Sequence, residues 1–253
     1  MLRHAALGGV ERFGVGSLRA GGAIAIAEPF PGAAPRPRLR AYEGGGGTTT
    51  AEVEGNRSDL YLIAKRVFDI LASLAATPVV VLVGLVLLVL NPAWNRGPLF
   101  YVQQRMGLDG RPFFAYKFRT MRAARCVTRG PNDPLESERI TRLGAFMRRS
   151  RIDELPQFLN VLQGRMSIIG PRPDFWDHAI HYVDIVPGYR RRHGVRPGIT
   201  GLAQVDCGYA EGIVATKLKT RYDLYYIRRQ GFRLDAYIVW RTLAVIATGF
   251  GAR

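Results

Sequence analysis

The chain is poor in cysteine, histidine and acidic residues. Its two cysteines, Cys126 and Cys207, lie far apart, which excludes a disulfide framework and a cysteine metal cluster and favours a reducing compartment. His178 and His181 can share a helix face, but no third ligand lies at metal spacing, so we assign no zinc. With 20 acidic residues against 36 lysines and arginines, the formal charge is +16, which calls for anionic partners: acidic lipid, phosphorylated substrates or nucleic acid.

The amino-terminal stretch, residues 1–58, is rich in Gly, Ala, Pro and Arg and has no strong apolar run. Such a composition cannot offset the entropy of ordering the chain, so we predict a disordered arm without a cleaved signal. The whole chain is 47% hydrophobic, which suffices for one sizeable core or a modest core plus one membrane segment. It is too short for a multi-span transporter.

A long apolar run follows the arm. Ile70 to Leu90 carries no charge, and about 21 residues at about 1.5 Å each can cross a bilayer core. Pro78 removes a backbone donor, so we expect a bend there, with the Thr77 hydroxyl satisfying the freed carbonyl. Cations flank both ends, which favours both ends on the cytoplasmic side and a kinked re-entrant helix over residues 59–92; an ordinary kinked span is the alternative. The flanking cations are Lys65, Arg66, Arg96 and Arg105.

Residues 93–253 have the mixed, basic composition of a soluble unit, which we predict to be a small, mostly helical α/β domain. Short strands are expected at 100–105 and 113–121, around a turn at Asp109-Gly110. Apolar residues at helical spacing predict amphipathic helices over residues 140–147, 152–162, 216–229 and 235–248. The last helix is mostly apolar but interrupted by Arg241, so we expect it to lie on the membrane surface rather than to cross it.

The segment from Arg148 to Gln157 places two adjacent carboxylates, Asp153 and Glu154, after three arginines. Ser150 and Asp153 match a capping box, which predicts that a helix begins here with both carboxylates in its first turn. Free amides at a helix start attract phosphate and keep a carboxylate ionised, as a nucleophile requires. Neighbouring helical residues project about 100° apart, so Asp153 can face phosphorus while Glu154 faces Mg²⁺. Taken alone, the segment is explained more simply by a cap with solvated arginines.

Other motifs hold cations in a constrained backbone. Lys117 and Arg119 alternate along a predicted strand and therefore point the same way. Gly170-Pro171-Arg172-Pro173 and Arg196-Pro197-Gly198 frame single arginines with proline. Proline limits backbone freedom, so an arginine held there can bind a phosphate bidentately at a lower entropic cost. Together with Arg148, these residues predict a phosphate-binding site.

Five segments follow one another in a fixed order: Lys65 to Asp69, Tyr116 to Met121, Asp153 to Gln157, Gly164 to Pro173 and Arg196 to Gly201. This order resembles the bacterial sugar transferase family, the monotopic polyprenyl-phosphate phosphoglycosyl transferases, in its small form without a multi-span bundle. The resemblance runs from Lys65 to about Thr242 and leaves the arm outside. It implies a catalytic unit on the cytoplasmic face of the bacterial inner membrane, held by re-entrant and interfacial helices, in exopolysaccharide, capsule or glycoconjugate synthesis.

The resemblance also implies a magnesium-dependent reaction in two steps. Asp153 would attack the sugar-bearing phosphate of a UDP-sugar, expel UMP and form a covalent glycosyl-phosphate intermediate, which polyprenyl (undecaprenyl) phosphate would then attack. Glu154 would hold Mg²⁺. The implied phosphate-binding residues are Lys117, Arg119, Arg148, Arg172 and Arg196. The implied lipid or membrane contacts are Lys65, Arg66, Asp69, Thr77 and Pro78.

The chain departs from the family pattern after Gly201. Leu202 replaces the usual Trp, and Asp206 to Tyr209 replaces an Asn-Gly-Arg run, so this loop does not reveal the sugar. Two other functions stay open: a membrane-bound, metal-dependent phosphohydrolase, and a noncatalytic basic adaptor for acidic lipid or nucleic acid. The tight motif order argues against the adaptor, and we expect no nucleic-acid partner. Inner-membrane lipids are expected partners, and a homodimer is left open.

Overall fold

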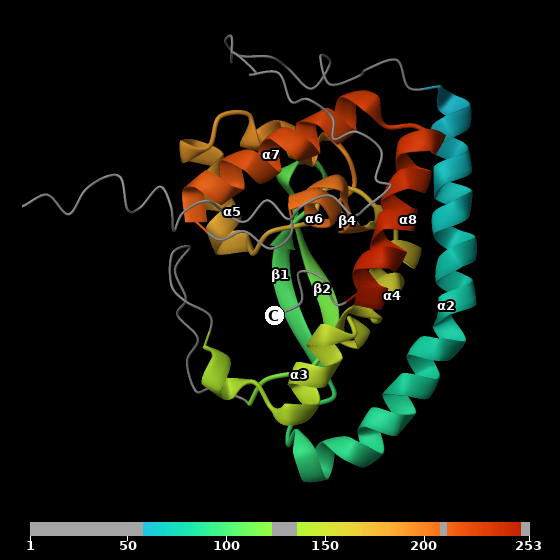
Figure 1. The fold of residues 1–253 in the computed structure, drawn as a ribbon, viewed down its shortest axis with the longest axis vertical. Helices are drawn as coiled ribbons and strands as arrows, with labels where there is room; N and C mark the ends of the chain where they lie inside the picture. The colour runs from blue at the N-terminus through green and yellow to red at the C-terminus, as the bar shows by residue number, and fades with distance from the viewer. Residues whose placement is uncertain (1–57, 123–135, 208–211, 249–253) are drawn as a thin grey trace, which may run out of the picture.

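Figure 1 shows a computed structural model of the chain, which describes residues 58–122, 136–207 and 212–248. A long helix, α2 (Asp59–Trp94), runs along one side of a domain in which helices surround two-stranded sheets. The domain has the mostly helical composition with some sheet that the sequence predicts. The predicted disordered arm lies outside the described residues, apart from Ser58, and stays a prediction.

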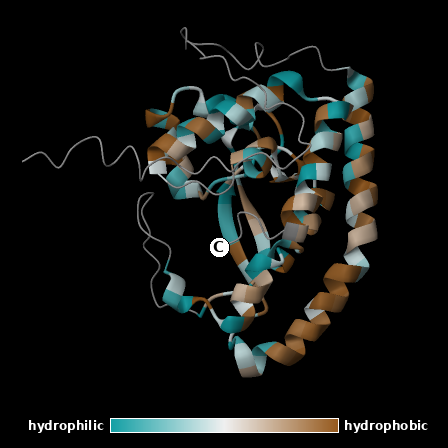
Figure 2. Ribbon diagram, viewed as in Figure 1, coloured by the Kyte–Doolittle hydropathy of each residue, from teal (hydrophilic) through white to brown (hydrophobic). Residues whose placement is uncertain are grey.

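Most of the apolar surface of α2 is not covered by protein. The helix begins after Ser58, whose hydroxyl caps it by accepting the backbone N–H of Tyr61 at 3.2 Å. Only 17% of its most apolar 18-residue window is buried, whereas a core helix of a soluble protein is mostly buried. Among the described residues, α2 is the helix long and apolar enough to cross a bilayer. Its lower half is strongly hydrophobic in Figure 2, in keeping with a membrane-associated helix.

The middle of α2 contains Pro78, and the ribbon changes direction between the two halves of the helix in Figure 1. A proline in a helix leaves the carbonyl four residues earlier, here that of Leu74, without its N–H partner. Thr77 donates its hydroxyl to the carbonyl of Ser73 instead, at 2.8 Å. The predicted role of Thr77 is therefore wrong, because its hydroxyl bonds the residue before the freed carbonyl, a back-bond that itself bends helices.

The predicted hairpin is confirmed by the antiparallel pair of β1 (Phe100–Met106) and β2 (Pro112–Phe118). The turn between them, Leu108–Gly110, contains Asp109 in the left-handed region, at φ 55° and ψ 24°. Aspartate tolerates this conformation better than most residues do, which agrees with the predicted turn. Strand β2 ends three residues earlier than predicted, so Arg119 lies beyond the strand.

Helix α3 (Arg142–Arg149) confirms the first amphipathic helix, but the chain does not open a new helix at Ser150. The Ser150 hydroxyl donates back to the carbonyl of Phe146 at 2.9 Å and so helps to close α3. Arg151 then turns the chain through the left-handed region, at φ 59° and ψ 13°. The predicted capping box is wrong, because Ser150 ends one helix instead of starting the next.

The adjacent carboxylates consequently lie in η4 (Ile152–Glu154), a single 3₁₀ turn. Helix α4 (Gln157–Leu162) begins only after Pro156. The predicted helix over 152–162 is thus split, and its first turn does not hold Asp153 and Glu154. Anion binding at a helix start does not explain this site, so its charge balance comes from side chains.

A parallel pair of short strands, β3 (Ser167–Ile169) and β4 (Gly198–Thr200), was not predicted. Glycines allow the close approach of the flanking backbone. A Cβ on Gly198 would lie 2.2 Å from the nitrogen of Gly170, and one on Gly201 would lie 2.2 Å from its oxygen. Since no side chain fits at these distances, glycine is required to bring the two proline-framed arginine motifs together.

The remaining helices pack around this pair. The main buried cluster includes Ile169, Leu202, Tyr226 and Ile238, and it joins β3 to the last three helices. The predicted helices over 216–229 and 235–248 are confirmed, each beginning a few residues earlier than expected. The elements are α5 (Trp176–Ile185), α6 (Leu202–Cys207), α7 (Gly212–Arg229) and α8 (Phe232–Thr248), with 3₁₀ turns η3 (Ser137–Arg139) and η5 (Tyr189–Gly194).

Helix α8 turns Arg241 inward and apolar side chains outward. Arg241 donates to the carbonyl of Val205 at 2.9 Å and lies 3.5 Å from the carboxylate of Asp206. Trp240 and Leu243 are 70% and 59% exposed. The arginine that interrupts the apolar pattern therefore binds α6, and the exposed apolar face has the character of a membrane-surface helix.

His193 is buried in η5 next to Arg192. Burial, reinforced by the charge of Arg192, lowers the pKa of His193 to about 3. An unfolded histidine has a pKa near 6.5, so between these values the unfolded chain binds the extra proton. Stability therefore falls as the pH drops below about 6.5.

We predict that acidification from pH 7.5 to pH 5 costs the wild type about 2 kcal/mol of unfolding free energy through His193, and that His193→Gln lacks this loss. The measurement is thermal unfolding of detergent-solubilised protein at both pH values. His181→Gln, at an exposed position, is the matched control and should keep the wild-type pH dependence. Identical pH slopes in all three proteins would contradict the assignment.

Candidate active site

Glu154 is the most strongly paired residue of the site. Its buried carboxylate accepts hydrogen bonds from Lys117 Nζ at 2.8 Å and from Arg172 Nη1 at 2.9 Å, and the second terminal nitrogen of Arg172 completes a bidentate pair. Burial alone would raise the pKa of this carboxyl, but Arg172 and Lys117 outweigh it and hold the pKa well below its usual range. Glu154 is therefore ionised and already neutralised by two cations.

Asp153 is buried beside this pair but is less strongly engaged. Its Oδ2 lies 3.8 Å from Lys117 Nζ, beyond hydrogen-bond distance. Burial raises the pKa of Asp153, with Lys117 opposing the shift and the charge of Glu154 adding to it. The oxygens of Asp153 thus make fewer contacts with cations than those of Glu154. A carboxylate with accessible lone pairs is suited to attack an electrophile.

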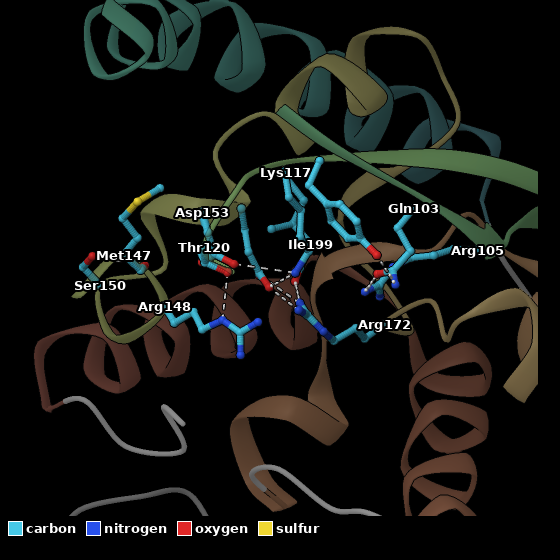
Figure 3. A network of polar contacts seen from close by, with 12 residues as sticks. Gln103, Arg105, Lys117, Thr120, Met147, Arg148, Ser150, Asp153, Arg172 and Ile199 are labelled. Atoms are coloured by element: carbon cyan, nitrogen blue, oxygen red, sulfur yellow. Dashed lines mark hydrogen bonds and ion pairs between the residues drawn. The ribbon is translucent and has the colours of Figure 1, made fainter. Parts of the chain in front are cut away.

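Arg148 is oriented toward the site by Thr120. Its Nε donates to the Thr120 hydroxyl at 3.0 Å, so the terminal nitrogens point away from this bond. Helix α3 can approach Thr120 because residue 144 is glycine: a Cβ there would lie 2.0 Å from the Thr120 carbonyl oxygen. Figure 3 shows Arg148 on one side of Asp153, with Lys117 and Arg172 on the other. The structure therefore brings together Lys117, Arg148, Arg172 and the two carboxylates, as the sequence predicts.

A buried arginine supports the segment that carries Arg172. Arg192 is 1% exposed and donates to the carbonyl of Arg172 at 2.6 Å. Its charge is matched by Asp223, whose carboxylate accepts from Arg192 Nε at 2.8 Å, and by an ion pair with Asp174. Because a buried charge is tolerated only when it is paired, this network holds the loop after β3 in one position.

Two predicted phosphate-binding arginines lie elsewhere. Arg119 follows the end of β2, and its Nη1 would lie 3.0 Å from a Cβ on Gly97. Arg196 is exposed and donates to the carbonyl of Gly164 at 2.9 Å. Among the described residues, no hydrogen bond or ion pair joins either arginine to the carboxylates of the site. Arg119 does not share a strand face with Lys117 as predicted, because β2 ends at Phe118, and Arg196 reaches toward the end of α4. Phosphate binding by either arginine stays a prediction.

Two residues predicted to contact lipid attach α2 to the domain. Asp69 is buried and accepts the backbone N–H of Ile168 at 2.9 Å and the hydroxyl of Ser167 at 3.1 Å. Arg66 donates to the last two carbonyls of α4, at 2.8 and 3.2 Å, where a cation also stabilises the helix dipole. In this arrangement both side chains point to protein, and they fix the amino-terminal half of α2 against β3 and α4.

The other predicted membrane contacts also lie in α2. Lys65 pairs with Asp235 of α8 at 2.6 Å. Thr77 and Pro78 lie in the middle of the helix, and no hydrogen bond or ion pair in the described part of the chain links them to the carboxylates. Lys65 thus joins α2 to α8 rather than forming part of the site.

Several polar residues next to the site were not predicted. Thr120 lies in a motif whose sequence prediction rests on its two cations, Lys117 and Arg119. On β1, Arg105 donates to the side-chain oxygen of Gln103 at 2.9 Å, and Gln103 lies 3.4 Å from the hydroxyl of Tyr101. The sequence does indicate this cluster, because Tyr101, Gln103 and Arg105 alternate along a predicted strand and must share one face.

The carboxylate pair fits Mg²⁺ only together with phosphate. In the ranges that the structure describes, no three His, Cys, Asp or Glu side chains gather as a metal site. Mg²⁺ is usually held by one or two carboxylates while substrate phosphates and water fill the other positions. Lys117 and Arg172 use most of the lone pairs of Glu154 but leave one direction on Oε2. Glu154 would hold the ion there beside a bound phosphate.

Comparison with known proteins shows the family to which the chain is similar. The family described as Bacterial sugar transferase matches residues 60–249, more than half of the chain. The chain is 43% identical over 197 residues to a UDP-N-acetylgalactosamine-undecaprenyl-phosphate N-acetylgalactosaminephosphotransferase of Aeromonas hydrophila, covering 78% of this chain and 46% of that one. It is 38% identical over 187 residues to a UDP-glucose:undecaprenyl-phosphate glucose-1-phosphate transferase of Klebsiella pneumoniae, covering 72% and 40%.

Similarity to a shorter relative extends over nearly the whole of that protein. The exopolysaccharide production protein PSS of Rhizobium leguminosarum bv. phaseoli is 38% identical over 196 residues, which is 72% of this chain and 94% of the relative. By contrast, the chain spans less than half the length of the two transferases above. The matched segment contains α2, the carboxylate pair and all the cations that surround it, and the chain belongs to the bacterial sugar transferase family.

Proposed function

We propose that this protein transfers a sugar phosphate from a UDP-sugar to polyprenyl (undecaprenyl) phosphate and releases UMP. The relatives named for this reaction support the proposal. The main supporting observation is that the two buried carboxylates are paired differently. Glu154 is paired with Lys117 and Arg172, while Asp153 lies 3.8 Å from Lys117. This arrangement supplies one charge-neutralised anchor and one nucleophile.

In the first step, an Asp153 oxygen attacks the phosphorus that bears the sugar. A new bond forms between that oxygen and phosphorus, and the bond from phosphorus to the bridging oxygen breaks, so that UMP leaves with the electron pair. Lys117, Arg172 and Arg148 surround the position where negative charge accumulates on the phosphate oxygens. Glu154 would hold Mg²⁺, which supplies further charge neutralisation when bound.

In the second step, a phosphate oxygen of the polyprenyl acceptor attacks the same phosphorus. The bond between Asp153 and phosphorus breaks, the carboxylate is regenerated, and the product is a polyprenyl diphosphate sugar. No proton transfer is needed if the acceptor phosphate is a dianion. The lack of a required proton transfer favours transfer over hydrolysis, because attack by water would need a general base, while attack by a phosphate oxygen does not.

The membrane arrangement follows from α2. We assign the chain to the cytoplasmic face of the bacterial inner membrane, with α2 entering the bilayer and returning to the same side and the apolar face of α8 on the membrane surface. The mostly unburied α2 and the exposed Trp240 and Leu243 support this assignment. It would place the carboxylates near the headgroups, where a polyprenyl phosphate presents its phosphate, in a pathway of exopolysaccharide, capsule or glycoconjugate synthesis.

Asp153→Asn should abolish a covalent adduct, because an amide is a poor nucleophile toward phosphorus. Purified protein incubated with a panel of UDP-sugars, without acceptor, should yield UMP and a peptide carrying one sugar phosphate on Asp153, detected by mass spectrometry. Glu154→Gln keeps the nucleophile and is the matched comparison: it should react slowly but still form the adduct. An adduct on the Asp153→Asn protein, or free sugar phosphate as the main product, would argue against the transferase.

Thr120→Val should raise the KM for the UDP-sugar about tenfold or more, because Arg148 loses the hydroxyl that orients it and a hydrogen bond to a charged group is worth about 1.5–3 kcal/mol. Steady-state UMP release measures the effect. Thr120→Ser retains the hydroxyl and should stay close to wild type. If both variants behave like the wild type, Arg148 does not depend on this contact.

The topology is tested with single cysteines in a Cys126→Ser, Cys207→Ser background. Thr49→Cys in the arm and Lys217→Cys on α7 should both resist an impermeant thiol reagent added to intact cells, and both should react after lysis, because a re-entrant α2 keeps both parts inside. Labelling of Thr49→Cys alone in intact cells would indicate a straight span instead.

A further inference from the structure

We propose that Tyr101 and Gln103, on the polar face of β1, bind the uracil ring of the nucleotide sugar. The proposal rests on the proposed function and assigns a nucleoside subsite within the same site. Neither residue takes part in the chemistry proposed above. Both project from the strand that forms one wall of the site.

The strand register places Tyr101 beside the phosphate-binding cations. Tyr101 lies directly opposite Lys117 in the antiparallel pair of β1 and β2. Side chains opposite each other in such a pair have Cβ atoms about 4.5–5.5 Å apart. Lys117 in turn contacts both carboxylates. Gln103 follows on the same face, about 7 Å further along the strand.

The in-line geometry of the reaction favours the β1 side of the site for the nucleoside. In phosphoryl transfer the attacking and leaving oxygens lie roughly in line through phosphorus. The leaving UMP must therefore extend away from Asp153, across the phosphate. In the view of Figure 3, Lys117 and Arg172 lie between Asp153 and Gln103, so a leaving group that passes these cations would extend toward Gln103.

The chemistry of the two side chains suits a pyrimidine base. Tyr101 is 43% exposed, which leaves its ring accessible for stacking. Arg105 can only donate hydrogen bonds, so the Gln103 atom that it contacts at 2.9 Å must be the amide oxygen. The Gln103 amide nitrogen is thereby turned outward, and its contact with the Tyr101 hydroxyl is long, at 3.4 Å. An outward amide donor matches the carbonyl oxygens of uracil.

Arg105 joins the subsite to the loop that carries Arg172. Arg105 is buried, donates to the carbonyl of Pro173, and lies with its guanidinium 4.9 Å from the ring of Phe175. Pro173 directly follows Arg172, which binds Glu154. A nucleotide that reaches from Arg172 to Gln103 would thus bind preorganised groups with little loss of side-chain entropy.

The experiment compares UMP with inorganic pyrophosphate as ligands of the purified full-length protein in detergent. Calorimetric binding and inhibition of UMP release are both measured. Tyr101→Ala should weaken UMP about tenfold or more while pyrophosphate inhibition stays within about twofold, because only UMP carries a base. Tyr101→Phe keeps the ring and should stay near wild type, and Gln103→Glu, which replaces the donor with an acceptor, should also weaken UMP selectively.

Phe114→Ala is the matched control, because Phe114 is also an exposed aromatic of the hairpin, at 54%, but on its other face. Equal UMP affinity in Tyr101→Ala, Phe114→Ala and the wild type would overturn the subsite while leaving the proposed function intact. Equal weakening of UMP and pyrophosphate by Tyr101→Ala would also overturn it, since the residue would then act through the cations. A wild type that releases no UMP from any UDP-sugar would refute the proposed function itself.

Discussion

The bidentate ion pair between Arg172 and Glu154, shared with Lys117, is the interaction on which the site depends. Two adjacent buried carboxylates repel each other and resist desolvation, so they can coexist only if one of them is neutralised. Arg172 and Lys117 neutralise Glu154 and leave Asp153 comparatively free. The pair also joins β2, η4 and the loop after β3, and so it is a structural tie as well as an electrostatic one.

Other parts of the fold serve to place those cations. Glycines at 170, 198 and 201 permit the backbone contact that brings the Arg172 loop beside β4, and the buried Arg192 holds the carbonyl of Arg172. Asp69 and Arg66 attach α2 to β3 and α4, the elements that adjoin the Arg172 loop and η4. A membrane-bound acceptor could then meet a nucleotide sugar at a fixed distance from the lipid surface.

The sequence predicted those parts that depend on local pattern or on separate motifs: the apolar helix, the hairpin, α3, α7, α8 and the gathering of Lys117, Arg148 and Arg172 around the carboxylates. It failed where tertiary contacts decide the outcome. Ser150 is a residue type that often begins a helix, but its hydroxyl donates to the carbonyl of Phe146 in the preceding helix. Arg196 donates to the carbonyl of Gly164. The β3–β4 pair has too few residues to show a period, and the contact of Thr120 with Arg148 joins residues far apart in the sequence.

In the proposed reaction, Asp153 makes and then breaks a bond to phosphorus. Each in-line displacement inverts the configuration at phosphorus, so two successive displacements retain it. A UDP-sugar with sulfur replacing one non-bridging oxygen of the sugar-bearing phosphate makes that phosphorus chiral. If Asp153 carries the sugar phosphate, the polyprenyl product of the wild-type enzyme should retain the donor's configuration at this phosphorus. Inversion would show that the acceptor attacks the donor directly, without Asp153 as an intermediate carrier.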